Sequence, residues 1–177
     1  MRNVTSRSLQ WVAKKMRPIG DMAGLLTPRV GVPVIVFSGK SILLGERKGS
    51  NVGEGRLQVS GGHLEFFETV LDCARREVLE ETNLKLLNPF IIQTTEHMYP
   101  KQRKHYIDIW VAGRAENPEE VMVKEPQKCS NWTFYPIDDI DRLSHRVFEG
   151  KGIIEAKFLR WLRFYMDVEQ TSQIHPA

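Results

Sequence analysis

The sequence predicts one α/β domain in which helices pack on a central mixed β-sheet. Short apolar runs rich in β-branched and aromatic residues alternate along the chain with segments whose apolar residues recur at helical spacing. Glycine, proline and asparagine residues separate these segments at the turns. Because strands and helices are interleaved, the helices are expected to cover the faces of one sheet. A length of 177 residues is enough for one such domain and too short for two ordinary ones.

Six strands are predicted from apolar runs that end at turn residues. They are Val30–Phe37, Ser41–Gly45, Leu57–Val59, Phe90–Thr95, Tyr106–Val111 and Asn131–Tyr135. Ser38-Gly39 is the turn between the first two strands, and the charged, glycine-rich residues 46–56 predict a loop before the third. Residues 115–130 predict a second long loop. The glycine pair Gly61-Gly62 is expected to begin a further loop after the third strand.

Three helices are predicted from apolar spacing and from signals at the helix ends. Thr69–Thr82 carries an apolar stripe on one face and charged residues elsewhere. Asn83 can end this helix, because asparagine tolerates the left-handed conformation of a helix cap. Pro136 is expected to start a short helix that runs through Leu143. Ile153–Met166 is expected to form the last helix.

The charge pattern divides the chain into a basic leader at residues 1–29, a folded domain at residues 30–167 and a C-terminal tail at residues 168–177. The leader holds six Lys or Arg residues and one acid, whereas the rest of the chain has 19 basic and 21 acidic residues. An acid-poor, arginine-rich start with apolar residues at helical spacing is typical of a mitochondrial transit peptide. A basic segment that stays on the protein is the alternative. The expected location is therefore the mitochondrial matrix or the cytoplasm.

The overall composition excludes several classes of protein. With 41% hydrophobic and 27% charged residues, the chain is expected to be globular and not disordered. No apolar run reaches the ~18 residues of a membrane-spanning helix, so no membrane partner is expected. The basic excess is confined to the leader, which argues against a nucleic-acid footprint over the whole domain. The two cysteines, Cys73 and Cys129, form no zinc-type cluster.

The helix predicted at Thr69–Thr82 places three acidic side chains in one region of space. Glu77 and Glu81 stand four residues apart, and Glu77 and Glu80 stand three apart. Like charges at these spacings repel each other by a few tenths of a kcal/mol per pair. Such a helix either faces water or binds cations. Carboxylate oxygens without nitrogen or sulfur ligands suit Mg²⁺ or Mn²⁺.

The spacing around this helix resembles the Nudix box. The box runs Gly, five residues, Glu, seven residues, Arg-Glu, an aliphatic residue, any residue, Glu-Glu, any residue, Gly and an aliphatic residue. The matching residues are Gly62, Glu68, Arg76, Glu77, Val78, Glu80, Glu81 and Leu84. Asn83 replaces the late glycine, and Ser60 and Phe67 stand where close relatives usually have Pro and Gly. The resemblance implies the Nudix fold, an α/β/α sandwich with a central mixed sheet.

The resemblance also assigns roles to the matching residues. It implies metal ligation by Gly61 through its carbonyl and by Glu77, Glu80 and Glu81. Arg76 and Glu68 would orient the glutamates by charge-assisted hydrogen bonds. The expected catalytic residues are Arg76, Glu80, Glu81 and Glu125. Members of the family use either a box glutamate or a glutamate from a later loop as the general base. The resemblance implies such a base role, or a metal-binding role, for Glu125, and an ordinary exposed acid is the other interpretation. Glu81 is expected to point to solvent and metal.

A wider similarity to the MutT-like branch of this family runs from about Val30 to Ile140. That branch hydrolyses nucleoside triphosphates, including oxidised and methylated guanine nucleotides. The resemblance implies that Arg47 contacts phosphate and that Gln58 and His63 line the nucleotide pocket. The aromatic segment that closes the base pocket in that branch is not found after Ile140, so the resemblance does not indicate which base is bound.

Three hypotheses follow from these patterns. The leading one is a nucleotide pyrophosphatase that uses magnesium or manganese to convert a nucleoside triphosphate into the monophosphate and pyrophosphate. The second keeps the chemistry and changes the substrate to an RNA 5′ triphosphate end, suited to the basic tract Tyr99–His105, or to a nucleotide sugar. The third is a nucleotide- or RNA-binding module with weak catalysis, against which the intact box argues. Many relatives pair as dimers, and the sequence leaves a homodimer open.

Three aromatic residues have two interpretations in these hypotheses. Tyr99, Tyr106 and Phe148 either stack on a nucleobase or belong to the core, where aromatic residues of this kind more often lie.

Overall fold

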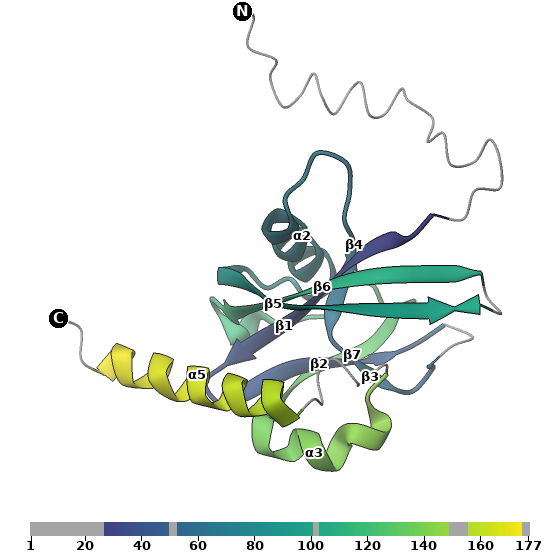
Figure 1. Ribbon diagram of the computed structural model, residues 1–177. Coiled ribbons are helices and arrows are strands. Elements are labelled where there is room, and N and C mark those ends of the chain that lie inside the picture. Colours follow the sequence, from purple (N-terminus) through teal and green to yellow (C-terminus); the bar gives the residue numbers. More distant parts are fainter. Residues whose placement is uncertain (1–26, 50–52, 101–102, 149–155, 175–177) are drawn as a thin grey trace, which may run out of the picture.

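The computed structural model describes residues 27–49, 53–100, 103–148 and 156–174. In this part of the chain, one mixed sheet has helix α2 on one face and helices α3 and α5 on the other (Figure 1). The α/β class and the central mixed sheet predicted from the sequence are confirmed. None of the described helices combines the length and the apolar character needed to span a bilayer.

Seven strands build the sheet: β1 (Arg29–Ser38), β2 (Ser41–Arg47), β3 (Leu57–Gln58), β4 (Ser60–His63), β5 (Leu86–Tyr99), β6 (Lys104–Ala115) and β7 (Cys129–Pro136). Strand β1 lies at the centre, parallel to β6 and antiparallel to β2 and β4. Its first half pairs with β4 and its end pairs with β2. Because β1 changes its antiparallel neighbour along its length, the sheet opens between β4 and β2, next to the short strand β3.

The helices are α2 (Val70–Thr82), α3 (Ile140–Leu143) and α5 (Ala156–Ile174), with 3₁₀ turns at Pro118–Glu120, Ile137–Asp139 and Ser144–Arg146. Thr69 caps the start of α2, where its hydroxyl accepts a hydrogen bond of 3.2 Å from the Asp72 amide. Asn83 ends α2 in the left-handed conformation at φ 65°, as the sequence predicted. The predicted helix from Pro136 is split into a 3₁₀ turn and α3.

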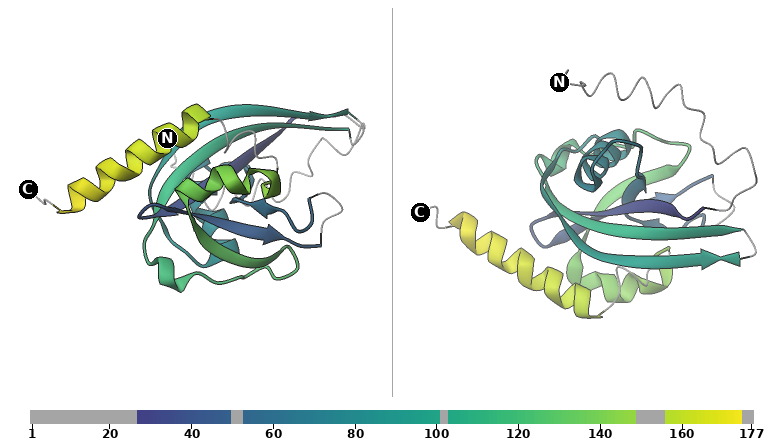
Figure 2. Two further views of the ribbon diagram at one scale, coloured as in Figure 1. Left: turned by 90° about the horizontal axis from the view of Figure 1, so that it is seen from below. Right: turned by 45° about the horizontal axis from the view of Figure 1, so that its top comes forward.

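Two apolar cores lie on opposite faces of the sheet. The first packs α2 on the sheet through Cys73, Ala74 and Val78, all fully buried. The second packs α3 and α5 on the other face and includes Leu159 and Leu162. Figure 2 shows α5 crossing one side of the sheet with its C-terminal end projecting beyond it. The two cores hold the sheet between them as the middle layer of a sandwich.

Three sequence predictions differ from the structure. Ser60–His63 is strand β4, where the sequence predicted a loop. A glycine pair has no preference for a strand, and this segment becomes a strand because it pairs with β1. Strands β5 and β6 extend well beyond the predicted runs. Helix α5 continues to Ile174, past the predicted end at Met166. The leader interpreted as a transit segment lies outside the described residues up to position 26, so that prediction is untested.

Candidate active site

Helix α2 crosses above β4 and brings its acidic face against the glycine pair of that strand. Burial of Cys73, Ala74 and Val78 on the sheet turns Glu77 and Glu81 toward β4. A Cβ atom at Gly62 would overlap the carboxylate of Glu77. Only glycine at this position therefore lets the acid approach the strand so closely.

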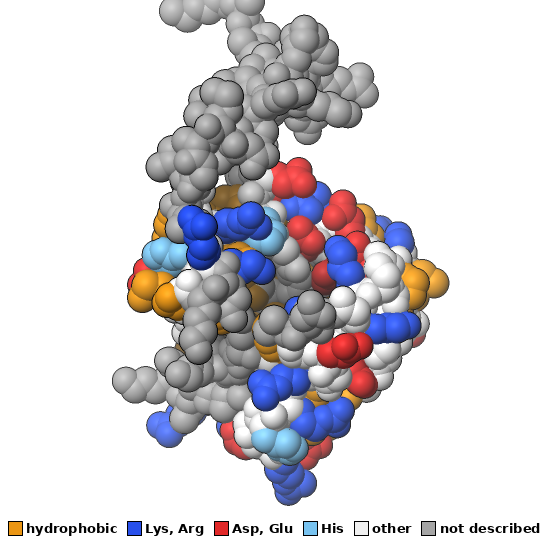
Figure 3. Space-filling model, turned by 90° about the vertical axis from the view of Figure 1, so that its right-hand side faces the viewer, with side chains coloured by type: hydrophobic (Ala, Val, Ile, Leu, Met, Phe, Trp, Pro, Cys, Tyr) orange, Lys and Arg blue, Asp and Glu red, His pale blue; other side chains and the backbone are white. Residues whose placement is uncertain are grey.

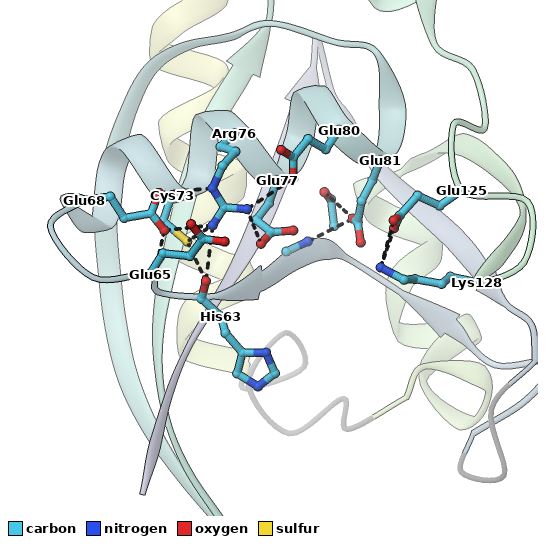
Figure 4. Close-up of polar contacts among 12 residues, drawn as sticks. His63, Glu65, Glu68, Cys73, Arg76, Glu77, Glu80, Glu81, Glu125 and Lys128 are labelled. Atoms are coloured by element: carbon cyan, nitrogen blue, oxygen red, sulfur yellow. Dashed lines mark hydrogen bonds and ion pairs between the residues drawn. The ribbon is translucent and has the colours of Figure 1, made fainter. Parts of the chain in front are cut away.

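Arg76 is the centre of the ion-pair network on α2 (Figure 4). Its guanidinium donates to both carboxylate oxygens of Glu68, at 3.1 and 2.8 Å. The same group donates to Glu77 at 2.7 Å and to Glu80 at 3.2 Å. These contacts lower the pKa of Glu68 below its ordinary value, chiefly through the hydrogen bonds from Arg76. Arg76 thus contacts three box glutamates at once, and its orienting role stays a prediction.

Glu81 faces inward, where the sequence predicted that it would point to solvent. Its Oε2 atom accepts hydrogen bonds from the Ser60 hydroxyl at 2.7 Å and from the Gly61 amide at 3.1 Å. Burial, together with the negative charges of Glu77 and Glu125, raises the pKa of Glu81 to about 7. The sequence prediction of its orientation was wrong, because the spacing of α2 does not show how closely β4 approaches.

Glu125 lies in the loop before β7, and its side chain is 27% exposed. It forms an ion pair of 2.8 Å with Lys128. The pKa of Lys128 is raised mainly by Glu125, with smaller contributions from the charges of Glu81 and Glu77. Lys128 and Glu125 therefore lie within electrostatic reach of the box acids, and Figure 4 shows them beside Glu81. Sequence reasoning identified Glu125 and missed Lys128.

A cavity of about 360 Å³ opens where β1 separates β4 from β2. The three residues predicted to bind substrate, Arg47, Gln58 and His63, all line it, together with Tyr99, Tyr106 and Phe148. Arg47 donates a hydrogen bond to Gln58 and lies 4.2 Å above the centre of the Phe148 ring. The His63 ring lies 5.8 Å from the ring of Tyr106. Of the two interpretations of Tyr99, Tyr106 and Phe148, the structure supports a place in the cavity wall.

The cavity and the acidic cluster meet at β4. Gly61 and Gly62 line the cavity, while the Gly61 amide contacts Glu81 and Gly62 adjoins Glu77. The His63 side chain points away from Arg76, whose Nη2 atom donates to the His63 carbonyl at 3.2 Å (Figure 4). Figure 3 shows the corresponding face, with acidic side chains on one side of a hollow and basic and histidine side chains on the other.

A comparison with known protein families identifies the family of proteins to which this site belongs. The family model for the NUDIX domain matches residues 27–162. The chain belongs to the Nudix hydrolase family. Enzymes of this family act on nucleoside diphosphates linked to another group, and they generally use divalent metals such as Mg²⁺ or Mn²⁺.

Solved Nudix structures share the fold at low sequence identity. A MutT NUDIX hydrolase from Burkholderia pseudomallei is 22% identical, with a TM-score of 0.58, over 63% of this chain and 85% of its own. A NUDIX family hydrolase from Clostridium perfringens is 17% identical, with a TM-score of 0.58, over 77% of this chain and 99% of its own. A bifunctional NMN adenylyltransferase/ADP ribose pyrophosphatase from Francisella tularensis is 18% identical, with a TM-score of 0.61, over 85% of this chain and 46% of its own.

The donor atoms of this Nudix site suit a hard divalent cation. They are carboxylate oxygens, and the pKa of Glu81 is raised first by burial and then by the negative charges of Glu77 and Glu125, which a cation would balance. Within the described residues, no three His, Cys, Asp or Glu side chains already converge as a metal site. Glu80, 58% exposed and bound to Arg76, would have to turn toward Glu77 and Glu81 to complete the set.

Three residues of the site escaped the sequence analysis. Ser60 donates to Glu81, although the sequence marked it only as a replacement for proline. Lys128 adds a positive charge beside the box acids. Asp108 lines the cavity from β6, in a run that the sequence identified only as a strand. Their roles depend on strand pairing and loop packing, which no local pattern encodes.

Proposed function

We propose that this Nudix protein is a metal-dependent pyrophosphohydrolase that cleaves a nucleoside triphosphate to the monophosphate and pyrophosphate. The proposal rests on one observation, which is that the cavity and the acidic cluster of α2 both adjoin strand β4. A cavity lined by aromatic and hydrogen-bonding side chains opens on one side, and the acids of α2 lie on the other. A nucleotide in the cavity would carry its phosphates over Gly61 and Gly62 to the carboxylates.

Mg²⁺ or Mn²⁺ would be held by Glu77, Glu80, Glu81 and the Gly61 carbonyl. The cation, when bound, makes an attacking water more acidic and neutralises charge on the leaving phosphate oxygens. Arg76 keeps Glu77 and Glu80 in position through hydrogen bonds of 2.7 and 3.2 Å. Glu81 and Glu125 are the two candidates for accepting the proton of the water, since both lie at the edge of this cluster.

Arg47, Gln58 and His63 would bind the nucleotide in the cavity. The Arg47 guanidinium, which stacks on Phe148 and donates to Gln58, would bring its positive charge to a phosphate oxygen of the nucleotide. Tyr106, next to His63, offers an aromatic surface of the kind on which a base stacks. The nucleotide is therefore held at both ends, which aligns the phosphoanhydride bond with the acids of α2.

A nucleotide sugar is the second candidate substrate. The Francisella protein that shares this fold over 85% of the present chain is described as an ADP ribose pyrophosphatase. An RNA 5′ triphosphate end is the third, because Lys104 lines the cavity and would lie close to further phosphates. All three candidates carry the same phosphoanhydride bond, so a substrate panel separates them.

The test is turnover of GTP, ATP, ADP-ribose and a 5′-triphosphorylated RNA with Mg²⁺, Mn²⁺ or EDTA, followed by chromatography of the products. We expect monophosphate and pyrophosphate from a free nucleoside triphosphate, and none in EDTA. Glu81→Gln should reduce turnover by at least about a hundredfold, because a metal ligand loses its charge. The exposed Glu119 provides the matched control, and Glu119→Gln should turn over like the parent. Full activity of Glu81→Gln would exclude this site.

A further inference from the structure

One row of residues crosses four strands on the cavity side of the sheet. His63 on β4 pairs with Gly31 on β1, Gly31 pairs with Asp108 on β6, and Asp108 pairs with Thr95 on β5. Paired residues in adjacent strands point to the same face of a sheet. His63, Gly31 and Asp108 all line the cavity, so this row forms part of its wall.

The Asp108 carboxylate leans across β1 at Gly31. A Cβ atom at Gly31 would overlap its Oδ1 atom, so a glycine in an otherwise valine-rich strand leaves room for the acid. Asp108 is the one carboxylate among the described residues that line the cavity. Its side chain is only 16% exposed, so the carboxylate is mostly buried in the cavity wall and does not extend into solvent.

A chain of polar contacts on β5 and β6 lies beside this carboxylate. The Oδ2 atom of Asp108 lies 3.5 Å from Nε2 of His97, and the same nitrogen lies 3.1 Å from the Thr95 hydroxyl. The Trp110 indole N–H donates to that hydroxyl at 2.9 Å. Every member of the chain sits on a strand, so the acid is held on rigid backbone and His97 is a positioning residue.

We infer that Asp108 reads the base of the bound nucleotide and selects bases with two adjacent N–H donors on one edge, as in guanine. The inference rests on the nucleotide hydrolase function proposed above. A carboxylate offers only acceptors, and its two oxygens match two parallel donors. Guanine presents such a pair in its N1–H and 2-amino groups. The ring of Tyr106, two residues along β6 on the same face, would lie beside the base.

The same chemistry discriminates against the other bases. Adenine offers one amino donor next to a ring nitrogen that accepts, and this acceptor would face the acid. Uracil has one N–H flanked by two carbonyl oxygens. Hypoxanthine keeps the N1–H of guanine and lacks its 2-amino group, so it tests the second hydrogen bond alone. A buried acceptor that loses a donor is costly, and hydrogen bonds to charged groups are stronger than neutral ones.

The experiment measures equilibrium binding of GMP, IMP, AMP and dGMP to the full chain in EDTA, by calorimetry. Monophosphates without metal cannot turn over, so this readout is independent of the proposed hydrolysis. We expect GMP to bind at least about tenfold more tightly than AMP, with IMP between them. Asp108→Asn should bring GMP and AMP to within about threefold of each other, because the amide offers adenine one donor and one acceptor. Asp141→Asn on α3, 63% exposed, is the control and should keep the parent's order.

Several outcomes would overturn the inference. One is equal binding of GMP and AMP by the parent, and another is no saturable binding of any of the four nucleotides. An Asp108→Asn variant that weakens all four alike would show that Asp108 does not read the base. If that variant fails to fold, the order of the affinities of the parent for GMP, IMP and AMP tests the inference. A guanine preference without metal-dependent turnover would support Asp108 and reject the proposed hydrolysis.

Discussion

The carboxylate of Glu81 lies half-buried between α2 and β4, beside other acids. Its pKa is raised to about 7 from an ordinary value of 4.5, first by burial and then by the charges of Glu77 and Glu125. The folded protein therefore holds a proton on Glu81 more tightly than the unfolded chain does. Without metal, the contribution of this group to stability is fully present below pH 4.5 and is lost as the pH rises to about 7.

This linkage predicts how stability depends on pH in EDTA. From pH 8 to pH 5, the parent should gain stability relative to Glu81→Gln by on the order of 2 kcal/mol, because glutamine does not titrate. Denaturant unfolding at several pH values measures the difference. Glu119→Gln, which changes an exposed acid, should follow the parent at every pH. A difference in unfolding free energy between the parent and Glu81→Gln that stayed constant across this pH range would show that Glu81 ionises like a surface acid.

Arg76 acts through geometry as well as charge. Its guanidinium donates to Glu68, Glu77 and Glu80 at once, which a lysine ammonium cannot reproduce with its compact, flexible group. Arg76→Lys should lower kcat by about ten- to a hundredfold in saturating Mg²⁺, the range seen when residues that support metal ligands are changed. Arg75→Lys is the matched control, since the neighbouring Arg75 forms an ion pair with the exposed Asp72 and none with a box glutamate among the described residues. Equal kcat values for the two variants would remove Arg76 from the site.

The box residues of this site could be predicted from the sequence because their relation is local. The spacing of Glu77, Glu80 and Glu81 on one helix is a property of the helix itself, and Arg76 follows from the same motif. The inward turn of Glu81 toward Ser60 could not be predicted, because it depends on how closely β4 lies to α2. The place of Asp108 in the cavity likewise requires the register of β1 against β6.

At the scale of elements, the turn between β4 and α2 contains a strained residue. Phe67 has φ 67°, a conformation that glycine adopts freely and that is costly for a bulky side chain. Its ring is 63% exposed, so little packing offsets the strain. The sequence marked this position as one where related chains carry glycine, and the structure shows the backbone conformation that explains it.

Replacing Phe67 with glycine should therefore stabilise the protein by about 0.5–1 kcal/mol, because relief of the strain exceeds the cost of the extra freedom that glycine gives the unfolded chain. Thermal unfolding measures this as a higher Tm. Phe66→Gly is the matched control, because Phe66 is 80% exposed and is not among the described residues with positive φ. The control should lower Tm or leave it unchanged. Equal changes in both variants would mean that exposure of the rings, and not backbone strain, governs this turn.

Elements were predictable where periodicity was strong, and their ends were predictable only where capping residues mark them. Helix α2 matches the predicted bounds to within one residue, since Thr69 and Asn83 supply clear end signals. Strands β5 and β6 form a long hairpin beyond their predicted ends, because each strand supports the other through cross-strand pairs. Such pairing lies outside what a single segment of sequence can indicate.

At the scale of the whole molecule, the acids and the cavity depend on different cores. Helix α2 and its acids pack on one face of the sheet with Val78 and its neighbours. Leu57 and Val147, adjacent to the cavity residues Gln58 and Phe148, belong to the core under α3 and α5. The wall of the cavity that would hold the nucleotide is thus supported by the core under α5, a helix that extends beyond its predicted end.

This arrangement predicts that damage to the α5 core weakens stability and substrate binding together. Leu162 is fully buried in the same cluster as Leu57 and Val147, so Leu162→Ala should cost about 2–4 kcal/mol of unfolding free energy. Phe164 lies on the same helix but is 65% exposed, and Phe164→Ala should change stability by less than about 1 kcal/mol.

Denaturant unfolding gives the stability change, and kinetics well below the melting temperature separate KM from kcat. We expect Leu162→Ala to raise KM with a smaller effect on kcat, because the cavity wall loosens while the acids on the opposite core keep their positions. Phe164→Ala should match the parent in both constants. A Leu162→Ala variant with a lower kcat and an unchanged KM would contradict the inference that one core supports the cavity and the other supports the acids.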